Sequence, residues 1–302
     1  MLKWIIPVIF SCLVIPAKTF GSDQIVVLTS AEIPYYLEAQ EGVNSKLGDR
    51  RHLIYHLKND PGNSQRVMDQ VQLVAPKGII AIGPLAVEAV KSYPVEAPVI
   101  FCMVINHAGA LKNLPDSHGV AFQISPEDSY ERVHQVLPRS KIAVLYNPEV
   151  TGSWIQNLAG YFEGYSLKLI PIPVTQPGDI AEALGKNRSR FNALWILPDG
   201  SFVDNVTIDY FIRYSLKEKV PLIGFSEGLA RSGALISLSG NNRKMGEEAV
   251  EVMDRVLAGK QKERIEFLKD IKTYLNTKVA ELFDIPINKT FYALVDRKFP
   301  EE

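Results

Sequence analysis

The chain has 302 residues, of which 46% are hydrophobic, and its 33 basic and 34 acidic residues give a formal net charge of −1. This length and apolar content are sufficient for two ordinary hydrophobic cores. The near-balance of charge provides no basic face, so nucleic acid is not expected as a partner.

Residues 1–21 have the layout of a secretory signal peptide. Lys3 precedes an apolar run over residues 4–15, and the small residues Thr19 and Gly21 follow it. This run is shorter than the ~20 apolar residues that span a bilayer. We therefore expect the chain to be exported to the periplasm or another extracytoplasmic compartment, with residues 1–21 removed.

The two cysteines, Cys12 and Cys102, predict a protein stabilised by its cores and not by disulfides. Cys12 lies inside the predicted signal peptide, so Cys102 has no partner for an intrachain bond. The residues before Cys12, Ile9-Phe10-Ser11, make a poor lipoprotein motif, and a lipid anchor is not expected.

Short apolar runs alternate with helix-length segments along the rest of the chain. The predicted strands are residues 25–28, 53–57, 78–82, 98–104, 141–146, 167–172, 193–197 and 221–225. The predicted helices are residues 34–47, 64–74, 85–91, 126–137, 151–162, 180–187, 203–217 and 242–257. Continuous apolar strands separated by helices are typical of parallel sheets that are covered on both faces.

This alternation predicts an α/β fold with two doubly wound parallel-sheet lobes and a ligand cleft between them. The first lobe is expected to contain residues 22–120 and about 239–260, and the second residues 121–238 and about 261–302. A single (β/α)8 barrel has the same number of units. The segment 106–119, rich in Asn, Gly, Pro and Asp, favours two lobes because it interrupts the alternation of strands and helices, as a crossover between lobes would. We expect hinges there and at residues 236–240.

Ligands of open α/β sheets bind beyond the carboxyl ends of the strands. Small hydroxyl, amide, glycine and acidic residues follow the predicted strands, and aromatic residues lie nearby. The candidate ligand-binding residues are Ser30, Tyr36, Gly83, Asn106, Tyr146, Asn147, Trp154, Asp199 and Ser226.

Asp199 is the candidate partner for a ligand ammonium, because a buried cation needs an ionised partner. Before Gly200 and Ser201 it is equally compatible with a turn or helix-cap role. Trp154 and Tyr36 are candidate aromatic walls for an apolar ligand body. Trp195 lies inside an apolar strand, where core packing is expected.

Enzymatic motifs are missing from the sequence. It contains no Gly-x-Ser-x-Gly elbow, no phosphate-binding Walker loop and no Gly-x-Gly-x-x-Gly after the first strand. The pair His52 and His56 lies on a predicted strand and does not have metal-ligand geometry. Glycosidase chemistry requires two carboxylates, and Asp199 and Glu227 at strand ends could supply them. No other feature of the sequence supports this activity. We expect no catalysis, no metal and no cofactor.

Several segments resemble the ABC-transporter substrate-binding protein family, in the branch that includes tryptophan- and aromatic-amino-acid-binding proteins. They are residues 30–47, 78–86, 98–104, 137–138, 142–148, 197–199, 224–235 and 245–260. The resemblance covers nearly the whole chain after residue 22 and implies the type I periplasmic-binding fold. The family's usual Pro-Gly-Gly-Asn-Val-Thr-Gly stretch is reduced here to His118-Gly119-Val120, so ligand identity does not transfer.

The resemblance implies that the chain captures a small ligand, such as an amino acid or a related organic molecule, by hinge closure and passes it to a membrane permease. The alternative is a sensor whose closed form docks on a membrane receptor or histidine kinase. The two functions share fold and pocket, and the sequence leaves both open.

Overall fold

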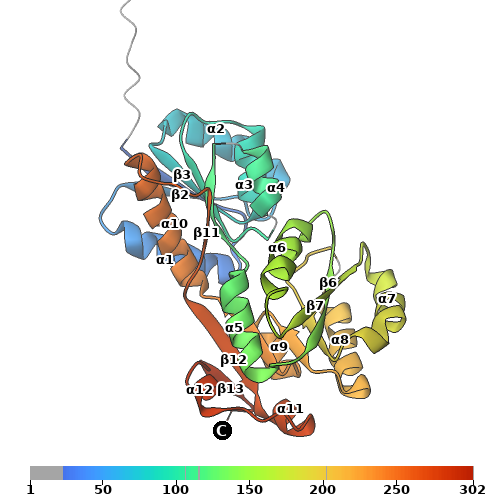
Figure 1. Ribbon diagram of the computed structural model, residues 1–302. Coiled ribbons are helices and arrows are strands. Elements are labelled where there is room, and N and C mark those ends of the chain that lie inside the picture. Colours follow the sequence, from blue (N-terminus) through green and yellow to red (C-terminus); the bar gives the residue numbers. More distant parts are fainter. Residues whose placement is uncertain (1–22, 106, 115, 202, 302) are drawn as a thin grey trace, which may run out of the picture.

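The computed structural model describes residues 23–301 except 106, 115 and 202. The predicted signal peptide and the candidate Asn106 lie outside the described residues. Two lobes lie side by side, each built on its own sheet (Figure 1). Within the described part of the chain, no helix combines the length and apolar character needed to cross a membrane.

The first lobe contains the N-terminal strands and a helix that returns from late in the chain. Its strands are β1 (Ile25–Thr29), β2 (His52–His56), β3 (Gly78–Ile82), β4 (Val99–Cys102), β5 (His118–Ala121) and β11 (Ile265–Phe267). Its helices are α1 (Pro34–Leu47), α2 (Ser64–Val74), α3 (Pro84–Ser92), α4 (His107–Asn113) and α10 (Asn242–Leu257), with a 3-10 turn at Pro61–Asn63.

The second lobe contains the middle of the chain and its C-terminal segment. Its strands are β6 (Lys141–Tyr146), β7 (Lys168–Pro173), β8 (Ala193–Ile196), β9 (Leu222–Gly224), β10 (Ile236–Gly240), β12 (Ile271–Asn276) and β13 (Arg297–Phe299). Its helices are α5 (Pro126–Val136), α6 (Gly152–Phe162), α7 (Ile180–Asn187), α8 (Asn205–Glu218), α9 (Glu227–Ser232), α11 (Thr277–Leu282) and α12 (Lys289–Tyr292), with 3-10 turns at Pro177–Asp179 and Arg188–Arg190.

The two sheets share one strand order. The first runs β2-β1-β3-β4-β5 with β11 added at its edge, and the second runs β7-β6-β8-β9-β10 with β12 and β13 added. All pairings are parallel except β10 with β12. This order is typical of doubly wound sheets, and it places the switch points between β1 and β3 and between β6 and β8. The predicted α/β class is confirmed, and the two separate sheets exclude a barrel.

Alternation of side chains along the strands explains why helices cover both faces. In β1, Val27 packs with α1 and α10 on one face, whereas Val26 packs with α2 and α3 on the other. In β6, Val144 packs with α5 and α6, and Ala143 with α7 and α8. Both faces of each sheet are therefore buried, as the continuous apolar strands predict.

The described chain crosses between the sheets at residues 122–125, at 241 and at 268–270. The prediction of a crossover within residues 106–119 is wrong, because α4 and β5 lie there and belong to the first lobe. Turn-forming residues are frequent around these two short elements, so the sequence pattern does not reveal them. The predicted division also placed residues after about 260 in the second lobe, whereas β11 pairs with β5 in the first sheet. The other lobe boundaries stay a prediction.

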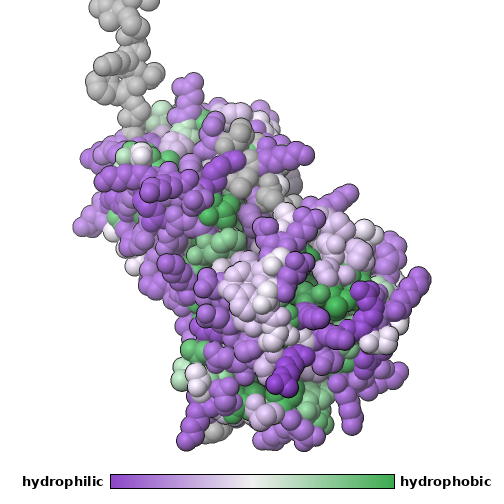
Figure 2. Space-filling model, in the orientation of Figure 1, coloured by the Kyte–Doolittle hydropathy of each residue, from purple (hydrophilic) through white to green (hydrophobic). Residues whose placement is uncertain are grey.

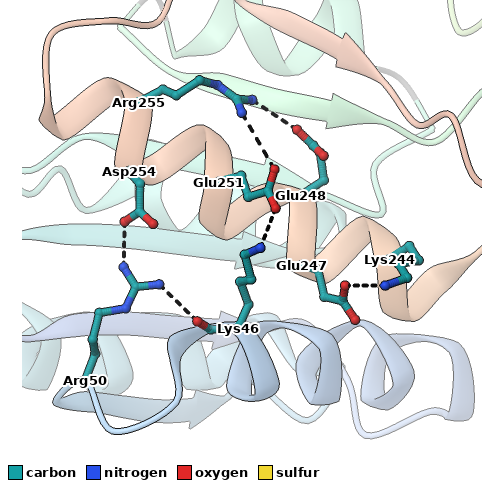
Figure 3. A network of polar contacts seen from close by, with 8 residues as sticks. All are labelled: Lys46, Arg50, Lys244, Glu247, Glu248, Glu251, Asp254 and Arg255. Carbon is teal, nitrogen blue, oxygen red and sulfur yellow. Dashed lines mark hydrogen bonds and ion pairs between the residues drawn. The ribbon is translucent and has the colours of Figure 1, made fainter.

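Helices α1 and α10 pack against each other with their backbones in close contact at two glycines. A Cβ atom at Gly42 would lie 1.9 Å from the carbonyl oxygen of Arg243, and one at Gly246 would lie 1.9 Å from that of Ala39. Only glycine permits this approach. At the far ends of the two helices, Arg50 pairs with Asp254 and Lys46 with Glu251, as Figure 3 shows.

Candidate functional site

A cavity of about 560 Å³ lies between the two lobes. The first lobe contributes α1, the start of α10 and the segment after β4. The second contributes α5, α6, β8, α9, β10, β12 and the segments after β8 and β9, and residues 122–124 of the first crossing segment complete the lining. The space-filling view shows hydrophobic side chains where the lobes meet, within a mainly hydrophilic surface (Figure 2). This volume is in the range of small-molecule sites, and an interlobe position is typical of them.

Aromatic side chains dominate the walls of the cavity. They are Tyr35, Tyr36, Phe122, Trp154, Trp195, Phe225 and Tyr274. Trp154 and Trp195 meet edge to face, with ring centroids 6.4 Å apart and planes at 84°. Tyr35 and Tyr36 form a second edge-to-face pair at 4.8 Å. Such walls suit a flat apolar body, which gains both burial and ring–ring contacts.

The first lobe presents two helix N-termini to this cavity. Contacts between α1 and α10 run in the same direction along both helices, from Glu38 with Asn242 to Arg50 with Asp254, so the helices are parallel. Neither helix has an acidic residue in its first turn. Their partial positive ends therefore add at the cavity, which favours an anionic group there.

Two acidic side chains also line the cavity. Glu227 is engaged by Arg231 at 2.8 Å and by Arg297 at 2.7 Å. Glu38 accepts a hydrogen bond from Asn242 Nδ2 at 2.9 Å. Glu38 is therefore the less neutralised carboxylate and the better partner for a cationic group, and it lies beside the two helix N-termini.

Tyr36 is held against the end of β3 by its neighbours Ser30 and Gly83. Gly83 has φ 88°, and a Cβ atom there would lie 2.7 Å from both Ser30 Oγ and Tyr36 Cζ. Ser30 Oγ accepts a hydrogen bond from the Ala86 amide at 2.9 Å, which ties β1 to the start of α3. Burial raises the pKa of Tyr36 to about 12, so its phenol stays protonated and able to donate. Ser30 and Gly83 support this side chain from behind, and neither lines the cavity.

Asp199 is fully buried and has protein partners on both carboxylate oxygens. Oδ2 accepts from the Asn147 amide at 3.0 Å and from Thr151 Oγ1 at 2.8 Å, and Oδ1 accepts from the Ser201 amide at 3.0 Å. Asn147 Nδ2 in turn donates to Ser201 Oγ at 3.0 Å. These bonds fasten the loop after β6 to the loop after β8. Asp199 does not line the cavity, and its contact with a ligand stays a prediction.

Of the nine candidates, Tyr36, Trp154 and Ser226 line the cavity. Ser226 also caps α9 by accepting from the Leu229 amide at 3.3 Å. Tyr146, at the end of β6, packs against the core of the second lobe, and Asn147 belongs to the Asp199 network.

Sequence reasoning missed most of the other lining residues. Trp195 packs in the core as expected, but it also lines the cavity, because β8 turns it to the face covered by α5 and α6. Phe225 precedes Ser226 at a predicted strand end, so the strand-end rule could have found it. Tyr274 lies on β12, an antiparallel strand that the βα rhythm does not predict.

The described residues offer little for catalysis. No group of three His, Cys, Asp or Glu side chains among them is arranged to hold a metal ion. Cys102 is fully buried, and burial raises the pKa of its thiol to about 12, which makes it inert as a nucleophile.

Comparison with known proteins gives one family and several relatives. The profile of the ABC transporter substrate binding protein family matches residues 24–297. A tyrosine-binding protein from Clostridioides difficile is 25% identical over 261 residues, which cover 80% of this chain and 73% of that protein. An uncharacterized protein from Rickettsia prowazekii is 23% identical and covers 75% of this chain and 73% of its own.

Solved structures share the fold at lower identity. A ligand-free, open substrate-binding protein with adhesive properties from Clostridium difficile has a TM-score of 0.70 and 16% identity, over 91% of this chain and 99% of the other. An ABC domain from Streptococcus pneumoniae in complex with L-Trp has a TM-score of 0.64 and 17% identity, over 91% of this chain and 100% of the other. These likenesses confirm the predicted type I periplasmic-binding fold.

Proposed function

The chain belongs to the ABC transporter substrate-binding protein family, and we propose that it captures an aromatic amino acid between its two lobes for uptake through a membrane permease. Membership confirms the resemblance read from the sequence. Proteins of this family are non-enzymatic binding components that work outside the cytoplasm with a membrane permease, in agreement with the prediction of no catalysis.

The observation that carries this proposal is the aromatic lining of the interlobe cavity. An aromatic ring bound there contacts Trp154, Trp195 and Phe225 in the second lobe. The α-carboxylate then lies at the N-termini of α1 and α10, and the α-ammonium near Glu38. The printed names of two relatives, one tyrosine-binding and one bound to L-Trp, support the same class of ligand.

Calorimetric titration of the purified protein with each of the common L-amino acids tests the ligand class. We expect the aromatic amino acids to bind and the aliphatic and charged ones to bind at least about 10-fold more weakly, since they leave the aromatic walls without a partner. Binding of a non-aromatic amino acid with no response to any aromatic one would overturn the proposal.

A matched pair of exposed tyrosines tests the place of binding. Tyr35 lines the cavity and is 47% exposed, and Tyr292 on α12 is 43% exposed and does not line it. Tyr35→Ala should weaken binding of the aromatic ligand about 10-fold. Tyr292→Ala should leave the affinity unchanged, because neither side chain is needed for the fold and only one touches the ligand. Equal effects of the two substitutions would contradict this site.

Closure of the cleft by hinge rotation is part of the proposal. The three crossing segments, at residues 122–125, 241 and 268–270, are short, and residues 122–124 of the first line the cavity. Rotation about them on the microsecond-to-millisecond scale encloses the ligand. Small-angle scattering should show a smaller radius of gyration with saturating ligand, and identical profiles would count against closure.

Export and delivery complete the proposal. Residues 1–21 act as the signal peptide, and N-terminal sequencing of the secreted protein should begin near residue 22. Cells that lack the protein should lose uptake of the labelled aromatic amino acid at low external concentration. Unchanged uptake, combined with normal binding in vitro, would remove the transport role and leave the binding function in place.

A further inference from the structure

Two buried polar atoms in the wall of the cavity have no hydrogen-bond partner among the described residues. They are the hydroxyl oxygen of Ser129 on α5 and the indole nitrogen Nε1 of Trp154 on α6. Ser129 is fully buried and Trp154 is 4% exposed. Both residues line the cavity. Buried polar groups are nearly always satisfied, so two orphans in one cavity wall need an explanation.

The cavity that Ser129 and Trp154 line is largely apolar, and Trp195, Leu197 and Leu238 are among its other lining residues. The edge-to-face contact with Trp195 fixes the indole ring, and hence the direction of its N–H. Helices α5 and α6 pack together in the second lobe. Hinge motion therefore leaves the spacing of the two groups unchanged.

We propose that Ser129 and Trp154 form a polar subsite that recognises an oxygen atom at the far end of the ligand's aromatic ring. The indole N–H can only donate, so the ligand must present an acceptor there. The serine hydroxyl can accept as well as donate. A phenolic hydroxyl satisfies both, because its oxygen accepts from Trp154 Nε1 while its proton is donated to Ser129 Oγ.

This inference rests on the proposed function and narrows the ligand class to 4-hydroxyphenyl compounds. The aromatic walls explain why a ring binds, whereas the subsite selects among rings. Phenylalanine leaves both protein groups unpaired, and the indole ring of tryptophan has no acceptor oxygen. A site built to bond a hydroxyl rejects the analogue that lacks it, because the protein groups then stay buried and unsatisfied.

The test is calorimetric titration of the purified protein with L-tyrosine and L-phenylalanine, which differ by one hydroxyl. We expect wild type to bind tyrosine about 10- to 100-fold more tightly. Ser129→Ala should reduce this ratio about 10-fold by weakening tyrosine binding alone. Trp154→Phe removes the N–H and should reduce the ratio in the same way.

Ser215→Ala is the matched control. Ser215 is also a fully buried helical serine whose hydroxyl has no partner in the described structure, but it lies on α8 and does not line the cavity. Both serine-to-alanine changes remove an unsatisfied hydroxyl and should leave the melting temperature equal or higher. Only Ser129→Ala should change the tyrosine-to-phenylalanine ratio.

The outcomes separate this inference from the proposed function. Binding of both amino acids with equal affinity, or a ratio that Ser129→Ala and Trp154→Phe leave unchanged, would overturn the subsite and keep the aromatic site. Preference for tryptophan over tyrosine would overturn the subsite as well. Failure of every aromatic amino acid to bind would overturn the proposed function itself.

Discussion

The first lobe and the second lobe follow the same strand order, yet they contribute different chemistry to the cavity between them. The first lobe contributes the N-termini of two parallel helices, together with Glu38 and Asn242. The second contributes the two tryptophans and the unsatisfied hydroxyl of Ser129. The shared topology places strand ends at one cleft, and the different residues at those ends are the basis of our proposal that the first lobe binds the head of an amino acid and the second its ring.

The lobes also differ in how their cavity-facing helices are held. In the first lobe, α1 and α10 are fixed by backbone contact at two glycines, and the solvent-exposed ion pairs at their ends add little. In the second, large side chains such as Trp154 and Phe162 fill the space under α6. The first lobe should therefore tolerate extra atoms at its helix contact far less than the second.

The largest effect should follow from Gly246→Ala in the first lobe. The new methyl group meets the carbonyl oxygen of Ala39, so the helices must separate. We expect a loss of about 3 kcal/mol or more in the free energy of unfolding by urea. Gly160→Ala in α6 is the matched control, because a Cβ there has no neighbour within 4 Å. It should be neutral or stabilise by up to about 1 kcal/mol. Equal losses in both variants would remove the contrast between the lobes.

A smaller effect is expected from Asp199→Ala in the second lobe. The substitution leaves the amides of Asn147 and Ser201 and the hydroxyl of Thr151 without their acceptor. The free energy of unfolding should fall by about 2–3 kcal/mol. Asp209→Ala, which removes a surface ion pair with Arg213, should change it by less than about 0.5 kcal/mol.

Affinity for the aromatic ligand distinguishes the two roles of Asp199. A role confined to the loops leaves Kd nearly unchanged in the variant, measured well below its melting temperature. Loss of two decades or more in affinity would restore Asp199 as the partner of the ligand ammonium.

The smallest expected effect is on the pH dependence of stability and involves His107, which lies near the crossing segments. Its Nδ1 atom lies 3.1 Å from Gln123 Oε1, and the ring of Phe267 packs against it edge to face. Burial lowers the pKa of His107 below its usual 6.5, against the opposing effect of the Gln123 hydrogen bond. The unfolded chain therefore takes up the proton first, and stability is lost as the pH falls below about 6.5. Urea unfolding from about pH 8 to about pH 5 should show a shallower pH dependence for His107→Gln than for wild type. Superimposable pH profiles would contradict this.

The strands and helices could be predicted because burial on both faces imposes a local pattern. Apolar runs such as residues 78–82 and helices such as 242–257 stand where the periodicity predicts them. β11 has three residues, too few for any periodicity, and only its pairing with β5 assigns it to the first sheet. β12 breaks the parallel rule at the edge of the second sheet, where a strand from the C-terminal segment can pair in either direction.

The candidate site could be predicted only where position along a strand determines position in space. Tyr36, Trp154 and Ser226 follow strand ends and line the cavity. Asp199 also follows a strand end, but its partners come from two separate loops, and no local pattern reveals that both its oxygens are engaged. The hydroxyl of Ser129 is unpaired because no donor or acceptor from another part of the fold reaches it. The local sequence around Ser129 does not determine this.

A crystal structure of the protein with bound L-tyrosine tests the central claim most directly. If the first lobe binds the head of the amino acid and the second its ring, the ligand's carboxylate should lie at the N-termini of α1 and α10. It places the phenolic oxygen within hydrogen-bond distance of Ser129 Oγ and Trp154 Nε1. A tyrosine bound in the reverse direction, with its carboxylate against α5 and α6, or bound outside the interlobe cavity, would contradict it.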